Sequence, residues 1–161
     1  MKPQRLILLC GLILTAMHAW AGPYEEGMAA YERGDYATAE KMLRSVAETG
    51  NPGAQATLAL MYDVGYGVAQ NNAEAKKWYR LAAIQGDKSA RYNLGGMYDA
   101  GQGGAQDLVR AYMWYELSVA AGNDAATADR DLVAQKMTPQ QIAEAQKLVR
   151  ECPQRQFKGC D

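Results

Sequence analysis

The sequence is short of the residues that most often carry catalysis and metal binding. It has one histidine, His18, and three cysteines among 161 residues. His18 lies in a leader-like segment, so a chain that loses this segment has no imidazole at all. That excludes Ser-His-Asp and Cys-His catalysis, the commonest general base, and nearly every histidine-containing zinc site. We therefore expect neither a metal nor a cofactor.

The chain also lacks a hydrophobic run long enough to cross a membrane. Two cations precede an apolar stretch at residues 6–16, and such a stretch falls short of the ~20 apolar residues that span a bilayer. Ala19-Trp20-Ala21 then places small residues at the two positions that a signal peptidase must accommodate. We expect residues 1–21 to be a signal peptide cleaved after Ala21. The remaining chain, residues 22–161, is then one periplasmic or secreted domain without membrane insertion.

An excess of positive charge is missing as well. Loss of Lys2 and Arg5 reduces the 17 Lys and Arg residues to 15 against 18 Asp and Glu, a formal net charge of −3. Nucleic-acid binding needs a basic face that replaces counterions, and anionic membrane surfaces also attract basic segments. Neither is expected as a partner.

Cysteine is confined, after that cleavage, to the last ten residues. Cys152 and Cys160 would lie in a compartment where thiols oxidise, so we expect an intramolecular disulfide. Closing so short a loop stabilises the tail by about 2–3 kcal/mol on the chain-entropy model. A redox-active pair is the alternative, but redox motifs usually hold the cysteines two residues apart at a helix start.

What the sequence does contain is internal repetition. Residues 50–85 align with residues 86–121 without a gap, with 14 identities in 36 positions. Self-similarity at this period predicts a solenoid of units that cannot bury their apolar faces alone. Trp78 and Trp114 hold the same place in each unit. We therefore interpret them as core residues rather than as a stacking platform for sugars or bases.

Within each unit the apolar spacing is helical. Ala54, Leu58 and Tyr62 lie four apart and form one stripe, and a second stripe is built around Trp78 and Tyr79. Helix starts are marked by Asn51-Pro52 before a helix near 52–64, by Asn71 and Asp107, and by a capping box at Thr138, Pro139 and Gln141. The pattern predicts an all-α fold of about eight helices in antiparallel pairs, with no strand.

The repeat also predicts the organisation of the domain. We expect units at about 24–49, 50–85 and 86–121, C-terminal capping helices at 122–151 and a cysteine-bearing tail at 152–161. Terminal units that depart from the repeat are expected because the ends of a solenoid meet water.

A paired-glycine stretch recurs between the two stripes of each unit. "YDVGYGVAQN" at 62–71 returns as "YDAGQGGAQD" at 98–107. Phosphate-binding glycine loops follow a strand and open a helix, whereas Gly65 and Gly101 follow helical patterns. We expect these two glycines to end helices in the left-handed conformation, and Gly67 and Gly103 to let the chain reverse.

This pattern closely resembles the Sel1-like repeat family, a relative of the tetratricopeptide repeat with a longer, glycine-bearing loop. The matching positions of the first unit are Ala54, Leu58, Tyr62, Gly65, Gly67, Ala75, Trp78, Tyr79, Ala82, Ala83 and Gly86. Those of the second are Ala90, Leu94, Gly95, Tyr98, Gly101, Gly103, Ala111, Trp114, Tyr115 and Gly122. The resemblance implies a right-handed α/α superhelix whose first helices line a concave groove that holds protein partners.

Groove residues are expected on the first helices, away from the Ala-Leu-Tyr stripe. They are Tyr31, Thr57, Leu60, Asp63, Tyr92, Asn93 and Asp99. Asn93 can clamp a peptide backbone because its amide offers a donor and an acceptor, and "YNLG" matches the tetratricopeptide stretch whose asparagine contacts ligands. A merely solvated helix face is the alternative.

The sequence thus favours a non-catalytic scaffold or adaptor of the bacterial envelope, a monomer that binds a partner protein or peptide. The alternative is a carboxylate-dependent cell-wall glycan hydrolase or a peptidoglycan-associated factor, for which two carboxylates must lie some 5–10 Å apart. The available carboxylates are Asp63, Asp99, Asp107 and Glu116. Because Asp63 and Asp99 repeat with the glycine loops, we expect them to bond loop amides instead.

Overall fold

The computed structural model describes residues 22–160, so the predicted signal peptide and its cleavage after Ala21 lie outside the described residues. Within this range the chain forms eight helices and no strand, which confirms the predicted all-α class. The helices are α2 (Pro23–Glu32), α3 (Tyr36–Glu48), α4 (Pro52–Val64), α5 (Asn72–Ile84), α6 (Lys88–Ala100), α7 (Leu108–Ala120), α8 (Ala126–Gln135) and α9 (Pro139–Gln154).

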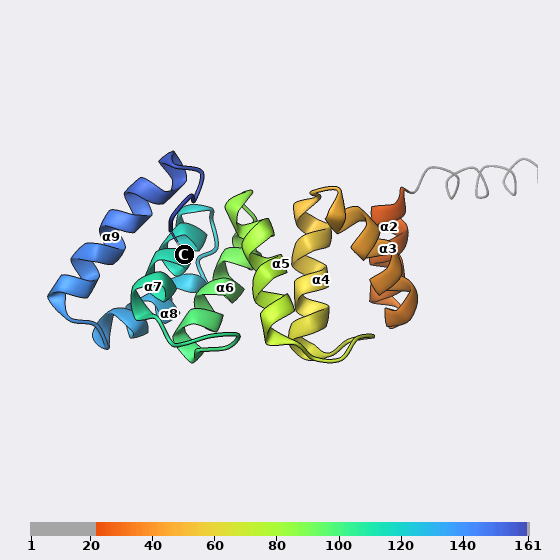
Figure 1. Ribbon diagram of the computed structural model, residues 1–161, viewed down its shortest axis with the longest axis horizontal. Coiled ribbons are helices and arrows are strands. Elements are labelled where there is room, and N and C mark those ends of the chain that lie inside the picture. The colour runs from red at the N-terminus through yellow and green to blue at the C-terminus, as the bar shows by residue number, and fades with distance from the viewer. Residues whose placement is uncertain (1–21, 161) are drawn as a thin grey trace, which may run out of the picture.

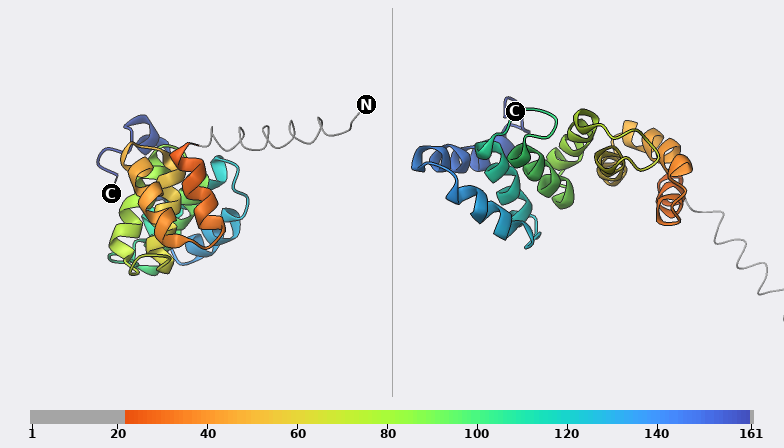
Figure 2. Two further views of the ribbon diagram at one scale, coloured as in Figure 1. Left: turned by 90° about the vertical axis from the view of Figure 1, so that its right-hand side faces the viewer. Right: turned by 90° about the horizontal axis from the view of Figure 1, so that it is seen from below.

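The helices follow one another along an elongated solenoid (Figure 1), which is narrow when viewed from its end (Figure 2, left). From α2 to α8 each helix packs on the next one in the chain. The last helix differs, because α9 makes its main contacts with α7. No helix between residues 22 and 160 is both long enough and apolar enough to span a bilayer.

Local capping signals explain where the helices begin. The Asn51 side chain accepts a hydrogen bond from the Ala54 amide at 2.9 Å, and Asn71 and Asp107 cap α5 and α7 in the same way. Thr138 forms the predicted capping box at the start of α9. These side chains satisfy amides that the first turn leaves without a partner, which confirms the expected helix starts.

The core is built from residues that hold the same place in each unit. Trp78 and Trp114 are 6% and 0% exposed, and Tyr79 and Tyr115 are 1% and 5% exposed. Buried alanines of the facing helices let these large rings approach the neighbouring backbone. The two tryptophans are core residues, as predicted.

The glycine loops have a second role beyond ending helices. Gly65 and Gly101 cap α4 and α6 with φ of 85° and 69°, as expected. A Cβ on Gly67 would lie 2.7 Å from the carbonyl oxygen of Tyr36, the first residue of α3. Each loop therefore docks its backbone directly on the helix start of the preceding unit, and Gly103 makes the equivalent contact on α5.

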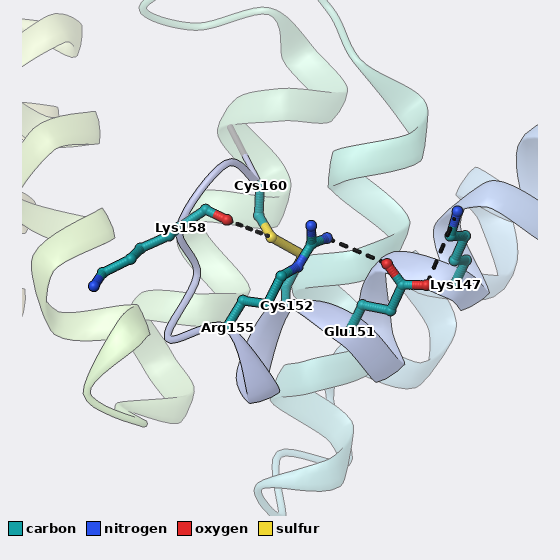
Figure 3. Close-up of a disulfide and its surroundings, with 6 residues drawn as sticks. All are labelled: Lys147, Glu151, Cys152, Arg155, Lys158 and Cys160. Carbon is teal, nitrogen blue, oxygen red and sulfur yellow. Dashed lines mark hydrogen bonds and ion pairs between the residues drawn. A yellow bond between two sulfur atoms is a disulfide. The ribbon is translucent and has the colours of Figure 1, made fainter.

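A disulfide between Cys152 and Cys160 closes the C-terminal end, as predicted (Figure 3). Cys152 lies in the last turn of α9, and Cys160 returns to it after a short loop. Phe157, within this loop, is 5% exposed and stacks on Trp114 with ring centroids 5.1 Å apart. The disulfide loop thus covers the end of the core.

Candidate peptide-binding groove

Two shallow hollows lie along the first helices of the units. One, of about 270 Å³, lies between α2, α4 and α6 and is lined by residues that include Thr57, Leu60 and Asp87. The other, of about 230 Å³, is lined by residues that include Asp63 and Tyr92. Asn93 lines both hollows, so they are neighbours, and we call the two together the groove.

The structure brings together five of the seven residues expected in the groove. Thr57 and Leu60 line the first hollow, Asp63 and Tyr92 the second, and Asn93 both. Tyr31 and Asp99 line neither. Sequence reasoning missed Asp87, which caps α6 through the Ala90 amide and also faces the first hollow.

Tyr31 belongs instead to a cluster of three tyrosines at the N-terminal end. Its ring meets Tyr36 edge-on at 5.5 Å, and Tyr36 stacks on Tyr66 of the first glycine loop at 4.6 Å. Burial, followed by the neighbouring Tyr36 and Tyr66, raises the pKa of Tyr31. The cluster fixes the glycine loop on α3. The signal for it in the sequence was Tyr66, an aromatic residue inside a glycine loop.

The prediction that Asp63 and Asp99 bond loop amides through their carboxylates is wrong. Their backbone carbonyls take the loop contacts: Gln70 donates to the Asp63 carbonyl at 2.7 Å, and Gln106 to the Asp99 carbonyl at 2.6 Å. The helix end supplies an unpaired carbonyl in each case, and the glutamine is long enough to reach it. Both carboxylates are left for other partners.

These two carboxylates have different surroundings. Both oxygens of Asp99 accept from Lys136 Nζ, at 3.1 and 3.2 Å. Asp63 is half-buried, and no described cation lies within ion-pair distance of it. Burial raises the pKa of Asp63, and the nearby Tyr79 hydroxyl opposes the rise. Asp63 is thus a partly desolvated carboxylate that lacks a counterion among the residues described.

Tyr79 lies beneath Asp63 and Asn93. Its hydroxyl is buried and makes no hydrogen bond of good geometry to any described residue. Burial raises the pKa of Tyr79, the charge of Asp63 raises it further, and Asn93 acts in the opposite direction. A buried hydroxyl without a well-aligned partner costs free energy, and this one lies next to two residues that line the groove, Asp63 and Asn93.

One repeat further along, Asp129 stands at the place of Asn93 and is bonded to another tyrosine. Tyr92 donates to Asp129 at 2.7 Å, and this hydrogen bond is the main cause of its raised pKa. Tyr115 packs beside Tyr92 with ring centroids 5.6 Å apart. Burial, followed by the charges of Asp129 and Asp99, raises the pKa of Tyr115.

The carboxylates considered for glycan hydrolysis are mostly engaged. Asp107 caps α7 and pairs with Arg110, and Glu116 accepts from Arg130 at 2.7 Å. Both hollows are also smaller than the roughly 300–1,000 Å³ of small-molecule sites. No cluster of metal-ligating side chains occurs among residues 22–160. The arrangement offers side-chain-sized recesses along helices.

The family model for the Sel1 repeat matches residues 52–87 and 88–123. These two segments are Sel1 repeats. Their borders lie two residues downstream of the units deduced from the sequence. Sel1 repeats typically mediate protein–protein interactions, and proteins built from them are generally non-catalytic scaffolds.

Solved structures share this fold. A protective antigen present in uropathogenic Escherichia coli strains, which displays an SLR fold, aligns over 84% of this chain with 24% identity and a TM-score of 0.77. A Sel1 repeat protein from Oxalobacter formigenes aligns over 65% with 33% identity and a TM-score of 0.61. The alignments cover 31% and 41% of those two chains. A comparison with curated proteins found no match.

Proposed function

We propose that this Sel1-repeat chain is a non-catalytic scaffold of the bacterial envelope that holds a partner protein or peptide in its groove. The observation that carries the proposal is that two neighbouring hollows, which share Asn93, lie along three successive first helices. An extended segment can lie along such a surface and place successive side chains in successive recesses.

The groove residues suit an extended peptide. Leu60 offers apolar area, and the Asn93 amide can donate to and accept from one peptide unit. These side chains stand on packed helices rather than on long loops, so little conformational entropy is lost when a partner binds.

Location in the envelope or outside the cell is part of the proposal. The Cys152–Cys160 disulfide is consistent with an oxidising compartment, and the leader-like residues 1–21 support export. The proposed domain is residues 22–161, acting as a monomer.

Absence of catalysis is proposed because three of the four candidate carboxylates are paired with cations. A hydrolase needs a second free carboxylate beside Asp63. We expect a peptidoglycan zymogram to show no clearing, with lysozyme as the positive control. A clear zone at the position of this chain would establish the hydrolase alternative instead.

The groove itself is tested by site-specific photo-crosslinking in the cells that produce the full chain. The probe replaces Leu60, which lines the first hollow, or Lys77, which is exposed on α5 and lines neither hollow. We expect one defined protein adduct from position 60 that weakens in the Asn93→Ala background, and no such adduct from position 77. Equal adducts from both positions would show that the groove is not the binding surface.

A further inference from the structure

Two equivalent sets of residues occur one repeat apart, and Asp63 and Asn93 of the first set line the groove. Asp63, Tyr79 and Asn93 form the first set. Adding 36 to each number gives the second set, Asp99, Tyr115 and Asp129. In each set a carboxylate at the end of one first helix and a polar residue on the next first helix lie near a tyrosine from the intervening second helix.

The second set already contains a cation. Lys136, which directly follows α8, places its ammonium group 3.1 and 3.2 Å from the two oxygens of Asp99. A bidentate contact of this kind is charge-assisted, which makes it stronger than a neutral hydrogen bond. The chain therefore shows which group satisfies a carboxylate at this place in the repeat.

The first set lacks that group. Ala100 stands where the repeat would place the counterpart of Lys136, and Gly101 follows it, so the end of α6 brings no cation toward Asp63. Neither hollow is lined by a lysine or an arginine, whereas Asp87 lines the first and Asp63 the second. The charge of the groove is therefore complementary to a cationic side chain.

A second observation points to the same place. The Tyr79 hydroxyl is buried beneath Asp63 and Asn93 without a well-aligned partner among the described residues. An incoming ammonium group would offset the unfavourable desolvation of the Asp63 carboxylate, which lies beside that hydroxyl.

We infer that the hollow beside Asp63 receives the ammonium group of a lysine side chain presented by the partner protein. The inference rests on the proposed function and adds the chemistry of the partner to it. Lysine fits because Lys136 fills the equivalent place within the chain itself, and a hollow of about 230 Å³ suits one side chain. The Asn93 amide then contacts the peptide unit next to that lysine.

The test uses three pools of synthetic nine-residue peptides with random flanks. They differ only at the central residue, which is lysine, acetyl-lysine or arginine, and each pool is titrated onto the immobilised full chain without its leader. Four variants are compared with the parent: Asp63→Asn, Ala100→Lys, Ala100→Gln and Asn93→Ala. Thermal melts establish that each variant is folded.

We expect the parent to bind the lysine pool at least about fivefold more tightly than the acetyl-lysine pool, the size of one partly buried charge-assisted contact. Asp63→Asn abolishes this preference. Ala100→Lys abolishes it too, because the new ammonium group occupies the subsite from within, whereas the neutral Ala100→Gln control keeps it.

Other outcomes separate the two proposals. Equal binding of the lysine and acetyl-lysine pools, weakened by Asn93→Ala, overturns the lysine inference and leaves a peptide groove. A preference for the arginine pool over the lysine pool also overturns it. Binding of no pool overturns it as well, and crosslinking from position 60 then decides separately whether the groove binds a partner.

Discussion

At the scale of single residues, Asp63 is a groove residue that lowers the free energy of unfolding of the fold that carries it. Its carboxylate is partly desolvated and has no described counterion, whereas Asp99 at the same place in the next repeat is paired with Lys136. Unfavourable interactions of this kind are tolerated where function uses them, and removing them commonly raises stability. Stability and binding should therefore respond in opposite directions to a change at Asp63.

Asp63→Asn is expected to raise the free energy of unfolding at neutral pH. The folded state raises the pKa of this carboxyl, so the folded chain binds more protons than the unfolded chain at mildly acidic pH. The cost of holding Asp63 charged is full above the raised pKa and disappears as the pH falls toward the unfolded value.

Urea denaturation between pH 3 and pH 8 measures this difference. The gain of the variant over the parent should be largest near neutral pH and should shrink in acid. The control is Asp99→Asn, which removes a paired carboxylate and should not stabilise the chain. A less stable Asp63→Asn protein at neutral pH would contradict the account of Asp63.

At the scale of secondary-structure elements, the glycine loops join neighbouring units rather than merely the two helices of one unit. Gly65 ends α4 with a positive φ, and a Cβ there would make only ordinary van der Waals contacts, the nearest at 3.5 Å to Gln70. Gly67 also has a positive φ, but a Cβ there would collide with the backbone of Tyr36. The two positions therefore separate the cost of backbone conformation from the cost of a lost contact.

Gly65→Ala should lower the free energy of unfolding by about 1 kcal/mol, the cost of an unfavourable φ. Gly67→Ala should cost at least twice as much, because the loop must also move away from α3. Circular-dichroism melts of the two variants measure the order. Equal losses would show that the contact between the Gly67 loop and α3 contributes nothing to stability.

Local chemistry explains which elements could be predicted from the sequence. Asn51, Gly65 and the capping box at Thr138 act on amides and carbonyls a few residues away, so their roles follow from spacing alone. The solenoid and its buried tryptophans follow from the 36-residue period.

The contacts of the groove could not be predicted in the same way. The contact of Gly67 with Tyr36 and the pairing of Lys136 with Asp99 depend on how one unit is rotated against the next. The wrong prediction for the Asp63 and Asp99 carboxylates has the same cause. The side-chain amides of Gln70 and Gln106 bond the backbone carbonyls of these residues and not their carboxylates. Repeat spacing locates a residue on a helix but does not select its partner across units.

At the scale of the whole molecule, the C-terminal disulfide closes a solenoid whose units contact only their neighbours. Such arrays lose stability from their ends, because an end unit has one interface instead of two. Phe157 on Trp114 and α9 on α7 provide the missing interface for the second repeat. The disulfide keeps that cover in place.

Replacing both cysteines, Cys152→Ser with Cys160→Ser, should lower the free energy of unfolding by about 2–3 kcal/mol. The loss should begin at the C-terminal end, so Trp114 should report unfolding at lower urea than the circular-dichroism signal of all helices. A Trp78→Phe background isolates the fluorescence of Trp114 in the chain without its leader.

The matched control for the cysteine pair is Phe157→Ala, which keeps the disulfide and removes the ring from Trp114. It should shift the fluorescence of Trp114 while the disulfide still holds the loop closed. Coincident fluorescence and circular-dichroism transitions in the cysteine variant would show that the disulfide loop does not protect one end selectively.

The backbone contacts of Gly67 and Gly103 also have a mechanical consequence. At these two glycines the loop backbone rests directly on the preceding unit, so no rotamer change at these contacts can absorb a bend or stretch between the units. The distance between the recesses is then fixed. A partner must match that spacing when it arrives, and the chain can act as a ruler for the distance between two side chains.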